Sequence, residues 1–154
     1  KTNLSVISSV IKSNEKRSIL LLKRVFNILN GKVKNKKICF LGVTFKANTD
    51  DMRDSSCLRM IPSLIKKGAK INYFDPTGEK NELKKIKNVN FSDNINSAIK
   101  NSDLIIIHTE WNDFKSINFK KVVQNQKFKI FDLRNIYSSE KMKENKIKYF
   151  AIGR

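Results

Sequence analysis

Short apolar runs that alternate with helical stretches constrain the fold of this chain more than any other feature. The most continuous run, 103–108 (DLIIIH), has four apolar residues between its ends, which is typical of a strand buried on both faces. From residue 37 onward strand and helix patterns alternate with short connections, which predicts an α/β fold: a Rossmann-like, doubly wound parallel sheet. The predicted strands are 37–43, 70–74, 89–91, 103–108, 129–133 and 148–152, and the predicted helices are 56–67, 79–85, 95–100, 119–124 and 139–144.

A long helical segment precedes this sheet. Apolar residues recur at helical spacing over 4–29, which predicts one long helix or two helices broken near Ser13-Asn14. Asn30-Gly31 supplies a C-terminal stop, and a polar connector follows it. We therefore place a boundary near residue 35, with a helical piece over 1–35 and the α/β domain over 36–154. A length of 154 residues suits one ordinary core with an appendage.

The formal net charge of +18 raises the question of nucleic-acid binding, because clustered lysines and arginines displace counterions from a phosphate backbone. Here the positive charge is almost all lysine and is scattered through every segment, which favours a solvated surface. We expect no nucleic-acid partner, and a basic nucleic-acid-binding module remains an alternative. The apolar runs fall far short of the roughly 18 residues of a membrane span, so we expect a soluble chain with no membrane partner.

Candidate binding residues follow the first and fifth predicted strands. Ligands of open parallel sheets bind beyond the carboxyl ends of the strands. The long loop after the first strand carries Lys46 and Arg53 beside three acids, and Arg134 follows the strand 129–133. In a parallel sheet Lys46 and Arg134 emerge at the same edge, where an ammonium and a guanidinium can clamp a diphosphate. The fingerprint GxGxxG is absent, so the first turn is a poor dinucleotide grip.

Each of these residues also has a purely structural alternative. Lys46 alone is compatible with a solvated loop lysine, and Arg134 with a salt bridge to Asp132 or a contact at a helix end. Arg53 lies just before a helix and has an acid, Asp50 or Asp51, as a possible partner. The helix that follows has three candidate caps: Asp54, Ser55 and Ser56.

The cysteines and the single histidine carry weaker signals. Cys39 lies inside the first strand, where a buried thiol is expected, and Cys57 lies in the first turn of a helix, where the dipole can lower a thiol pKa. The two cysteines lack metal-ligand spacing, so we expect neither a disulfide nor a metal site, as suits a reducing cytoplasm. His108 ends an apolar strand and is expected to be structural. Trp111 and Phe114 are expected to pack a loop against the sheet.

Five sequence blocks together resemble the C-terminal half of UDP-glucose 6-dehydrogenases. They are FLGVTFKANTDDMRDSS, MIPSLIKKGAKINYFDPTG, HTEWNDF, FDLRNIY and YFAIGR, and they cover 36–154 almost completely, in the family's order. The preceding VISSVIKSNEKR resembles the end of the family's central helical region. The resemblance implies a C-terminal, UDP-binding part of an enzyme that oxidises UDP-glucose to UDP-glucuronate with two NAD and one water.

The resemblance also implies partners and residue roles. Family members are cytoplasmic, with an N-terminal NAD-binding domain and a central helical domain through which subunits dimerise. We therefore expect UDP-glucose as ligand, NAD as cofactor and a homodimer formed through the N-terminal helix. By resemblance Phe45 and Lys46 contact the substrate, with Lys46 near the diphosphate and ribose. Arg134 binds the UDP moiety, and Arg53 reaches NAD held mainly by the N-terminal domain.

The sequence also departs from the family. Ala47 stands where many members have proline, and Leu133 where many have glycine before the arginine. The resemblance places the catalytic cysteine upstream of Lys1, so neither cysteine of this chain takes that role and the fragment is expected to be inactive alone. Dehydrogenases of GDP-mannose or UDP-N-acetylmannosamine share the first loop and remain alternatives.

Overall fold

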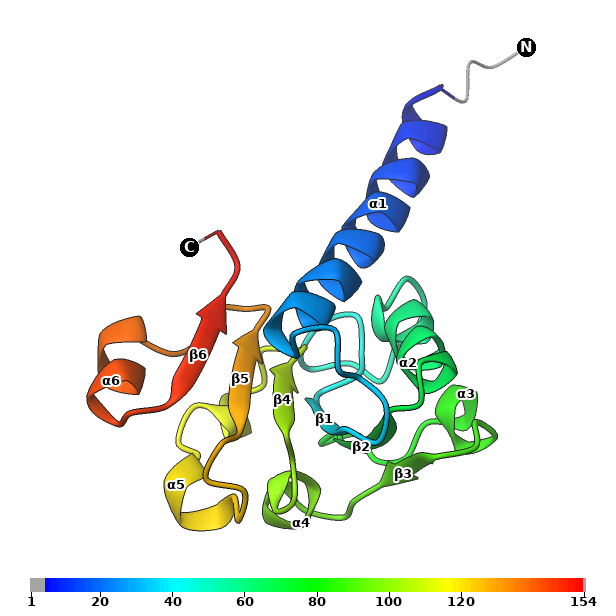
Figure 1. Cartoon of the computed structure of the whole chain (residues 1–154). Helices are drawn as coiled ribbons and strands as arrows, with labels where there is room; N and C mark the ends of the chain where they lie inside the picture. Colours follow the sequence, from blue (N-terminus) through cyan, green and yellow to red (C-terminus); the bar gives the residue numbers. More distant parts are fainter. Residues whose placement is uncertain (1–4, 154) are drawn as a thin grey trace.

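The structure, a computed structural model, describes residues 5–153 and the side chains of residues 16–153. A parallel sheet forms the centre of the molecule, and helices cover both of its faces (Figure 1). The strands are β1 (Lys37–Leu41), β2 (Lys70–Phe74), β3 (Val89–Phe91), β4 (Leu104–Ile107), β5 (Lys129–Asp132) and β6 (Lys148–Ala151). The helices are α1 (Ser5–Ile28), α2 (Cys57–Lys66), α3 (Asn81–Lys84), α4 (Ile95–Ile99), α5 (Phe119–Val122) and α6 (Ser139–Glu144), with a 3-10 turn η1 (Asn112–Phe114).

The strand order is β3-β2-β1-β4-β5-β6, and each neighbouring pair is parallel. The chain moves outward from β1 to β3, returns to pair β4 with the other side of β1, and continues to β6. This order confirms the predicted doubly wound, Rossmann-like sheet. The reversal lies between β1 and β4, so the loops after these strands diverge there and leave room for a ligand.

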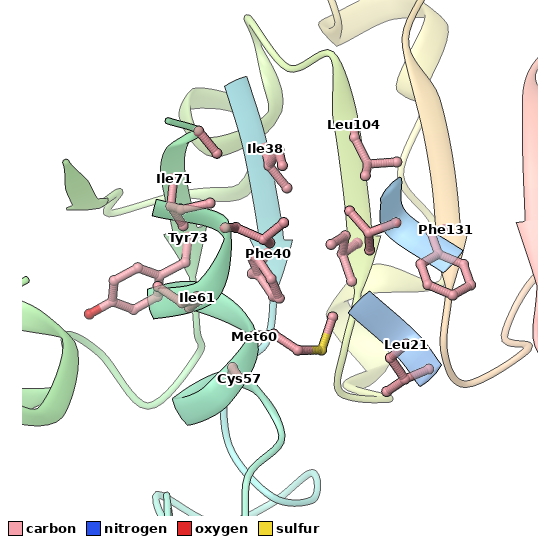
Figure 2. Packing of buried hydrophobic residues seen from close by; sticks show 14 of the residues in the cluster. Leu21, Ile38, Phe40, Cys57, Met60, Ile61, Ile71, Tyr73, Leu104 and Phe131 are labelled. Atoms are coloured by element: carbon pink, nitrogen blue, oxygen red, sulfur yellow. The ribbon is translucent and has the colours of Figure 1, made fainter. Parts of the chain in front are cut away.

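Alternating strand residues divide the interior into two cores. In β1, Ile38 and Phe40 face the core covered by α1, α2 and α3, whereas Cys39 and Leu41 face the core covered by α4, α5 and α6. All four residues of β4 are buried because this central strand is covered on both sides. Figure 2 shows Met60 and Ile61 of α2 packed against Phe40 and its neighbours in the first core. The two-sided burial explains why the apolar runs of the sequence are continuous.

Helix α1 is continuous, so the alternative of two helices broken near Ser13-Asn14 is wrong. Its last turns dock on the sheet, with Leu21 and Val25 buried in the first core, and its first turns extend away from the sheet (Figure 1). Arg24 fixes this position: its guanidinium lies 5.2 Å from the centre of the Phe131 ring and donates to the carbonyl of Ala151. Earlier in the same helix, Ile19 and Leu20 are more than half exposed. The proposed boundary near residue 35 falls in the turn between α1 and β1, and the division into two domains stays a prediction.

The predicted strands are all present, but β1 ends earlier than the sequence indicates. Gly42 turns the chain out of the strand with φ +75°, and the amide of Val43 donates to the Asp75 carboxylate at 2.8 Å instead of to a neighbouring strand. The 3-10 turn η1 was not predicted. The Asn30-Gly31 stop is confirmed, since α1 ends at Ile28 and both residues adopt positive φ.

Candidate functional site

Three loops meet at the carboxyl edge of the sheet, beside the point where strand order reverses. They follow β1, β4 and β5, which are consecutive neighbours in the sheet. The loop after β1 carries Phe45 and Lys46, the loop after β4 begins with His108, and the loop after β5 carries Arg134. Parallel strand direction therefore brings together side chains that are almost 90 residues apart in the sequence.

Buried polar groups hold the first loop in place. The carboxylate of Asp75, at the end of β2, accepts hydrogen bonds from the amides of Val43 and Thr44 at 2.8 and 3.4 Å. The other oxygen of Asp75 lies 3.9 Å from the buried ammonium of Lys80. The hydroxyl of Thr44 then donates to the carbonyl of Lys46 at 3.1 Å. The backbone at Lys46 is thus positioned by contacts with the core.

Arg134 links all three loops through its guanidinium. Nε donates to the His108 carbonyl at 2.8 Å, and Nη2 donates to the Phe45 carbonyl at 3.1 Å. Oε2 of Glu110 lies 2.8 Å from Nε, and since the hydrogen of Nε is directed to His108, this is a contact of opposite charges. The suggested salt bridge to Asp132 is wrong: that carboxylate accepts the backbone amide of Arg134 at 2.9 Å. The guanidinium is oriented by three partners, which suits the presentation of its remaining N–H groups to an anion.

Lys46 and Arg134 line the same cavity, which has a volume of about 220 Å³. Phe45, about half exposed, lines it as well. The structure therefore brings together the three residues for which the sequence analysis predicts substrate contacts. The remaining lining residues are Arg17, Ser18, Leu21, Ser56, His108 and Leu133.

Several lining residues were not singled out as binding residues from the sequence. Arg17 adds a third cation from α1, and it lies one turn before the buried Leu21, so helical spacing alone would have placed it on the docked face of the helix. The sequence indicates Ser56 only as a candidate cap. It does occupy the N-cap position of α2, but its side chain makes no capping hydrogen bond. Leu133, a departure from the family pattern, is buried in the cavity wall directly before Arg134.

Arg53 lies outside this cavity on the outer part of the loop. Its guanidinium donates to both carboxylate oxygens of Asp51, with Nη2 at 2.8 Å from Oδ2, and its side chain is 88% exposed. These hydrogen bonds lower the pKa of the Asp51 carboxyl to about 2. The structural alternative considered for Arg53, a pair with Asp51, is therefore present. Its expected contact with NAD stays a prediction.

His108 is buried and its pKa is lowered to about 3, first because burial penalises the imidazolium and then because Arg134 and Arg17 lie near. The imidazole is therefore neutral at physiological pH. Nε2 lies 2.8 Å from the Ser56 hydroxyl, and Nδ1 lies 3.1 Å from the Thr109 hydroxyl. This satisfied, uncharged histidine has the structural role that the sequence indicates, in the wall of the cavity.

The two cysteines are buried, unpaired thiols. Burial raises the pKa of the Cys57 thiol to about 12, and its sulfur donates to the carbonyl of Val43 at 2.9 Å. Desolvation therefore outweighs the helix dipole that made a lowered pKa conceivable. Burial also raises the pKa of Cys39. Neither thiol has the character of a nucleophile.

A larger hollow of about 640 Å³ lies at the opposite, amino edge of the sheet. Seven lysines and a single acid, Asp103, line it, and Lys129 and Lys148, the first residues of β5 and β6, are among the lysines. This lysine-rich hollow is therefore separate from the cavity that contains Lys46 and Arg134. That cavity depends on a few oriented cations and not on the general excess of lysine.

Within residues 5–153, no helix is long and apolar enough to cross a membrane. Among the side chains of residues 16–153, no group of three or more histidine, cysteine, aspartate or glutamate residues could hold a metal ion.

The fold and the cavity define a class of protein. A doubly wound parallel sheet carries three cations and a half-exposed aromatic side chain at its switch point, and lacks the glycine fingerprint for a dinucleotide. This is a Rossmann-like domain suited to an anionic, nucleotide-like ligand.

The chain belongs to the UDP-glucose/GDP-mannose dehydrogenase family, whose UDP binding domain matches residues 39–139. It is 38% identical to the UDP-glucose 6-dehydrogenase of Rickettsia felis, over 96% of this chain and 34% of that protein. It is 32% identical to the enzyme of the same name from Rhizobium meliloti, over 99% of this chain and 35% of the relative. The chain thus spans about a third of the length of these curated relatives.

A solved structure shows the same fold. The UDP-glucose dehydrogenase of Pyrobaculum islandicum superimposes with a TM-score of 0.70 at 22% identity, over 93% of this chain and 31% of that structure. This likeness confirms the α/β architecture.

Proposed function

We propose that this chain is the substrate-binding part of a UDP-glucose 6-dehydrogenase and that its cavity binds the UDP moiety of UDP-glucose. The observation that carries the proposal is that Lys46 and Arg134 line one cavity at the switch point of the sheet. A diphosphate bears about two negative charges, and the oriented guanidinium and the loop ammonium complement it. Phe45, half exposed in the same wall, supplies an apolar surface for the remainder of the nucleotide.

This chain contributes only a secondary contact to NAD. The chain lacks the glycine fingerprint, so its residues do not form the main dinucleotide grip. Arg53, largely exposed on the outer part of the loop after β1, contributes a cation toward NAD held by another domain of the whole enzyme. When bound, NAD accepts the hydrides removed from C6 of the sugar.

The catalytic thiol of the whole enzyme is neither Cys39 nor Cys57. Both are buried and have raised pKa values, so the thiolate that a covalent intermediate requires is disfavoured at each. This chain alone is therefore inactive in UDP-glucose oxidation. We further propose that the whole protein acts in the cytoplasm as a homodimer formed through α1, whose exposed Ile19 and Leu20 offer an apolar face.

Isothermal titration calorimetry with UDP and UDP-glucose tests the binding proposal. Lys46→Ala and Arg134→Ala should each weaken binding about 10- to 100-fold, the range for one lost charge-assisted contact. Lys127→Ala is the matched control, because it removes one exposed lysine from the opposite edge of the sheet and should leave affinity unchanged. Equal affinities for all four proteins would remove the assignment of Lys46 and Arg134.

A further inference from the structure

A continuous chain of hydrogen bonds runs from the loop after β1 to the wall of the cavity. The hydroxyl of Thr109 lies 2.9 Å from the carbonyl oxygen of Thr44. Nδ1 of His108 lies 3.1 Å from the same Thr109 hydroxyl, and Nε2 lies 2.8 Å from the Ser56 hydroxyl. Ser56 lines the cavity with Lys46 and Arg134.

Only one direction of hydrogen bonding satisfies this chain. A carbonyl oxygen can only accept, so the single hydroxyl hydrogen of Thr109 is donated to Thr44. The Thr109 oxygen must then accept from His108, which places the imidazole hydrogen on Nδ1. In a neutral imidazole the other nitrogen is an acceptor, so Nε2 accepts the hydroxyl hydrogen of Ser56.

The neutrality of His108 is secured by its surroundings. The ring is buried, and Arg134 and Arg17, the charged groups that act on it, are both cationic. A second proton would place a third positive charge beside them without access to water. The imidazole therefore keeps one hydrogen, and the direction of the chain is fixed.

Ser56 is left with acceptor capacity alone. Its hydrogen is used by His108, and its oxygen makes no capping bond to the first turn of α2, although it occupies the N-cap position. A serine hydroxyl has two lone pairs, and in this arrangement both remain available at the half-buried position that lines the cavity.

We propose that the Ser56 oxygen is an obligatory hydrogen-bond acceptor that selects a hydroxyl group of the bound nucleotide sugar. The inference deepens the proposed function and rests on it. The Ser56 acceptor also orients the ligand, because the oxygens of an ionised diphosphate cannot donate a hydrogen bond to it. The diphosphate therefore lies toward Lys46 and Arg134, and a hydroxyl of the ribose or of the sugar lies at Ser56. Thr109 and His108 act as positioning residues.

The first test compares two serines of the same region by calorimetry with UDP-glucose. Ser56→Ala removes the acceptor and should weaken binding about three- to tenfold, the range for one neutral hydrogen bond. Ser63→Ala is the matched control, because Ser63 lies in α2 outside the cavity and donates to the carbonyl of Arg59 at 2.8 Å. Unchanged affinity in folded Ser56→Ala, with melting temperature as the check on folding, would overturn the inference.

The second test concerns the direction of the bond. UDP-glucose analogues in which one hydroxyl is replaced by fluorine cannot donate at that position. One analogue should bind wild type about three- to tenfold more weakly than UDP-glucose does and should lose nothing further in Ser56→Ala. If each analogue lost equal affinity in both proteins, Ser56 would not be the acceptor. If wild type bound neither UDP nor UDP-glucose, the proposed function itself would fail, which separates the two hypotheses.

Discussion

Replacement of Gly42 by alanine tests how closely the chain at the end of β1 packs against the loop after β4. Gly42 has φ +75°, and a Cβ built on it would lie 2.5 Å from Cβ and 2.8 Å from Oγ1 of Thr109. The left-handed conformation costs an alanine about 1–2 kcal/mol. Overpacking against a rigid neighbour adds about 1–3 kcal/mol, and the stiffer unfolded chain returns about 0.4–1 kcal/mol. The expected loss of unfolding free energy is therefore about 1–5 kcal/mol, with a central value of about 3 kcal/mol.

Gly78 provides the matched control for this prediction. It has φ +85°, but a Cβ there would meet nothing within 4 Å, so Gly78→Ala carries only the conformational cost of about 1 kcal/mol. Urea unfolding followed by the fluorescence of Trp111, the single tryptophan, measures both variants. Equal losses would refute the steric argument. Gly42→Ala should also displace Thr109 and thereby weaken UDP-glucose binding, which Gly78→Ala should not do.

Three further predictions concern buried titratable groups. The pKa of His108 is lowered to about 3 in the folded protein, so as pH falls below about 6.5 the imidazole takes up a proton in the unfolded protein before it does so in the folded protein. Stability should therefore fall by about 1.4 kcal/mol per pH unit between about pH 5.5 and the folded pKa of about 3. Acid unfolding of His108→Asn should lack this component, and identical slopes would contradict the assignment. Asp75→Ala leaves the buried ammonium of Lys80 without its carboxylate, although Nζ still donates to the carbonyl and hydroxyl of Thr77. It should cost about 3–5 kcal/mol in urea unfolding, whereas a loss below about 1 kcal/mol would show that the pair does not organise the loop. Cys39 and Cys57 should react with a thiol reagent only after unfolding, and rapid labelling of the native protein would disprove their burial.

Much of the fold follows from local sequence signals. These signals are the strand and helix periods, the continuous apolar run at 104–107 and the Asn30-Gly31 stop. Each acts over a few residues, so it can be recognised without knowledge of the tertiary structure. The residue at which β1 ends could not be predicted from local signals. Val43 continues the apolar pattern, but its amide is used by Asp75, a residue that becomes its neighbour only when β2 pairs with β1.

The sequence by itself determined that Lys46 and Arg134 emerge at one edge, because every strand of a doubly wound sheet runs in the same direction. Only the tertiary structure decided the partners of these residues. Arg134 pairs with Glu110 and not with Asp132, and Ser56 meets His108, because the order of strands places β4 between β1 and β5. Spacing along the chain fixes the direction in which a residue leaves the sheet. Contacts between loops depend on which strands are neighbours, and that order is settled by the packing of the whole core.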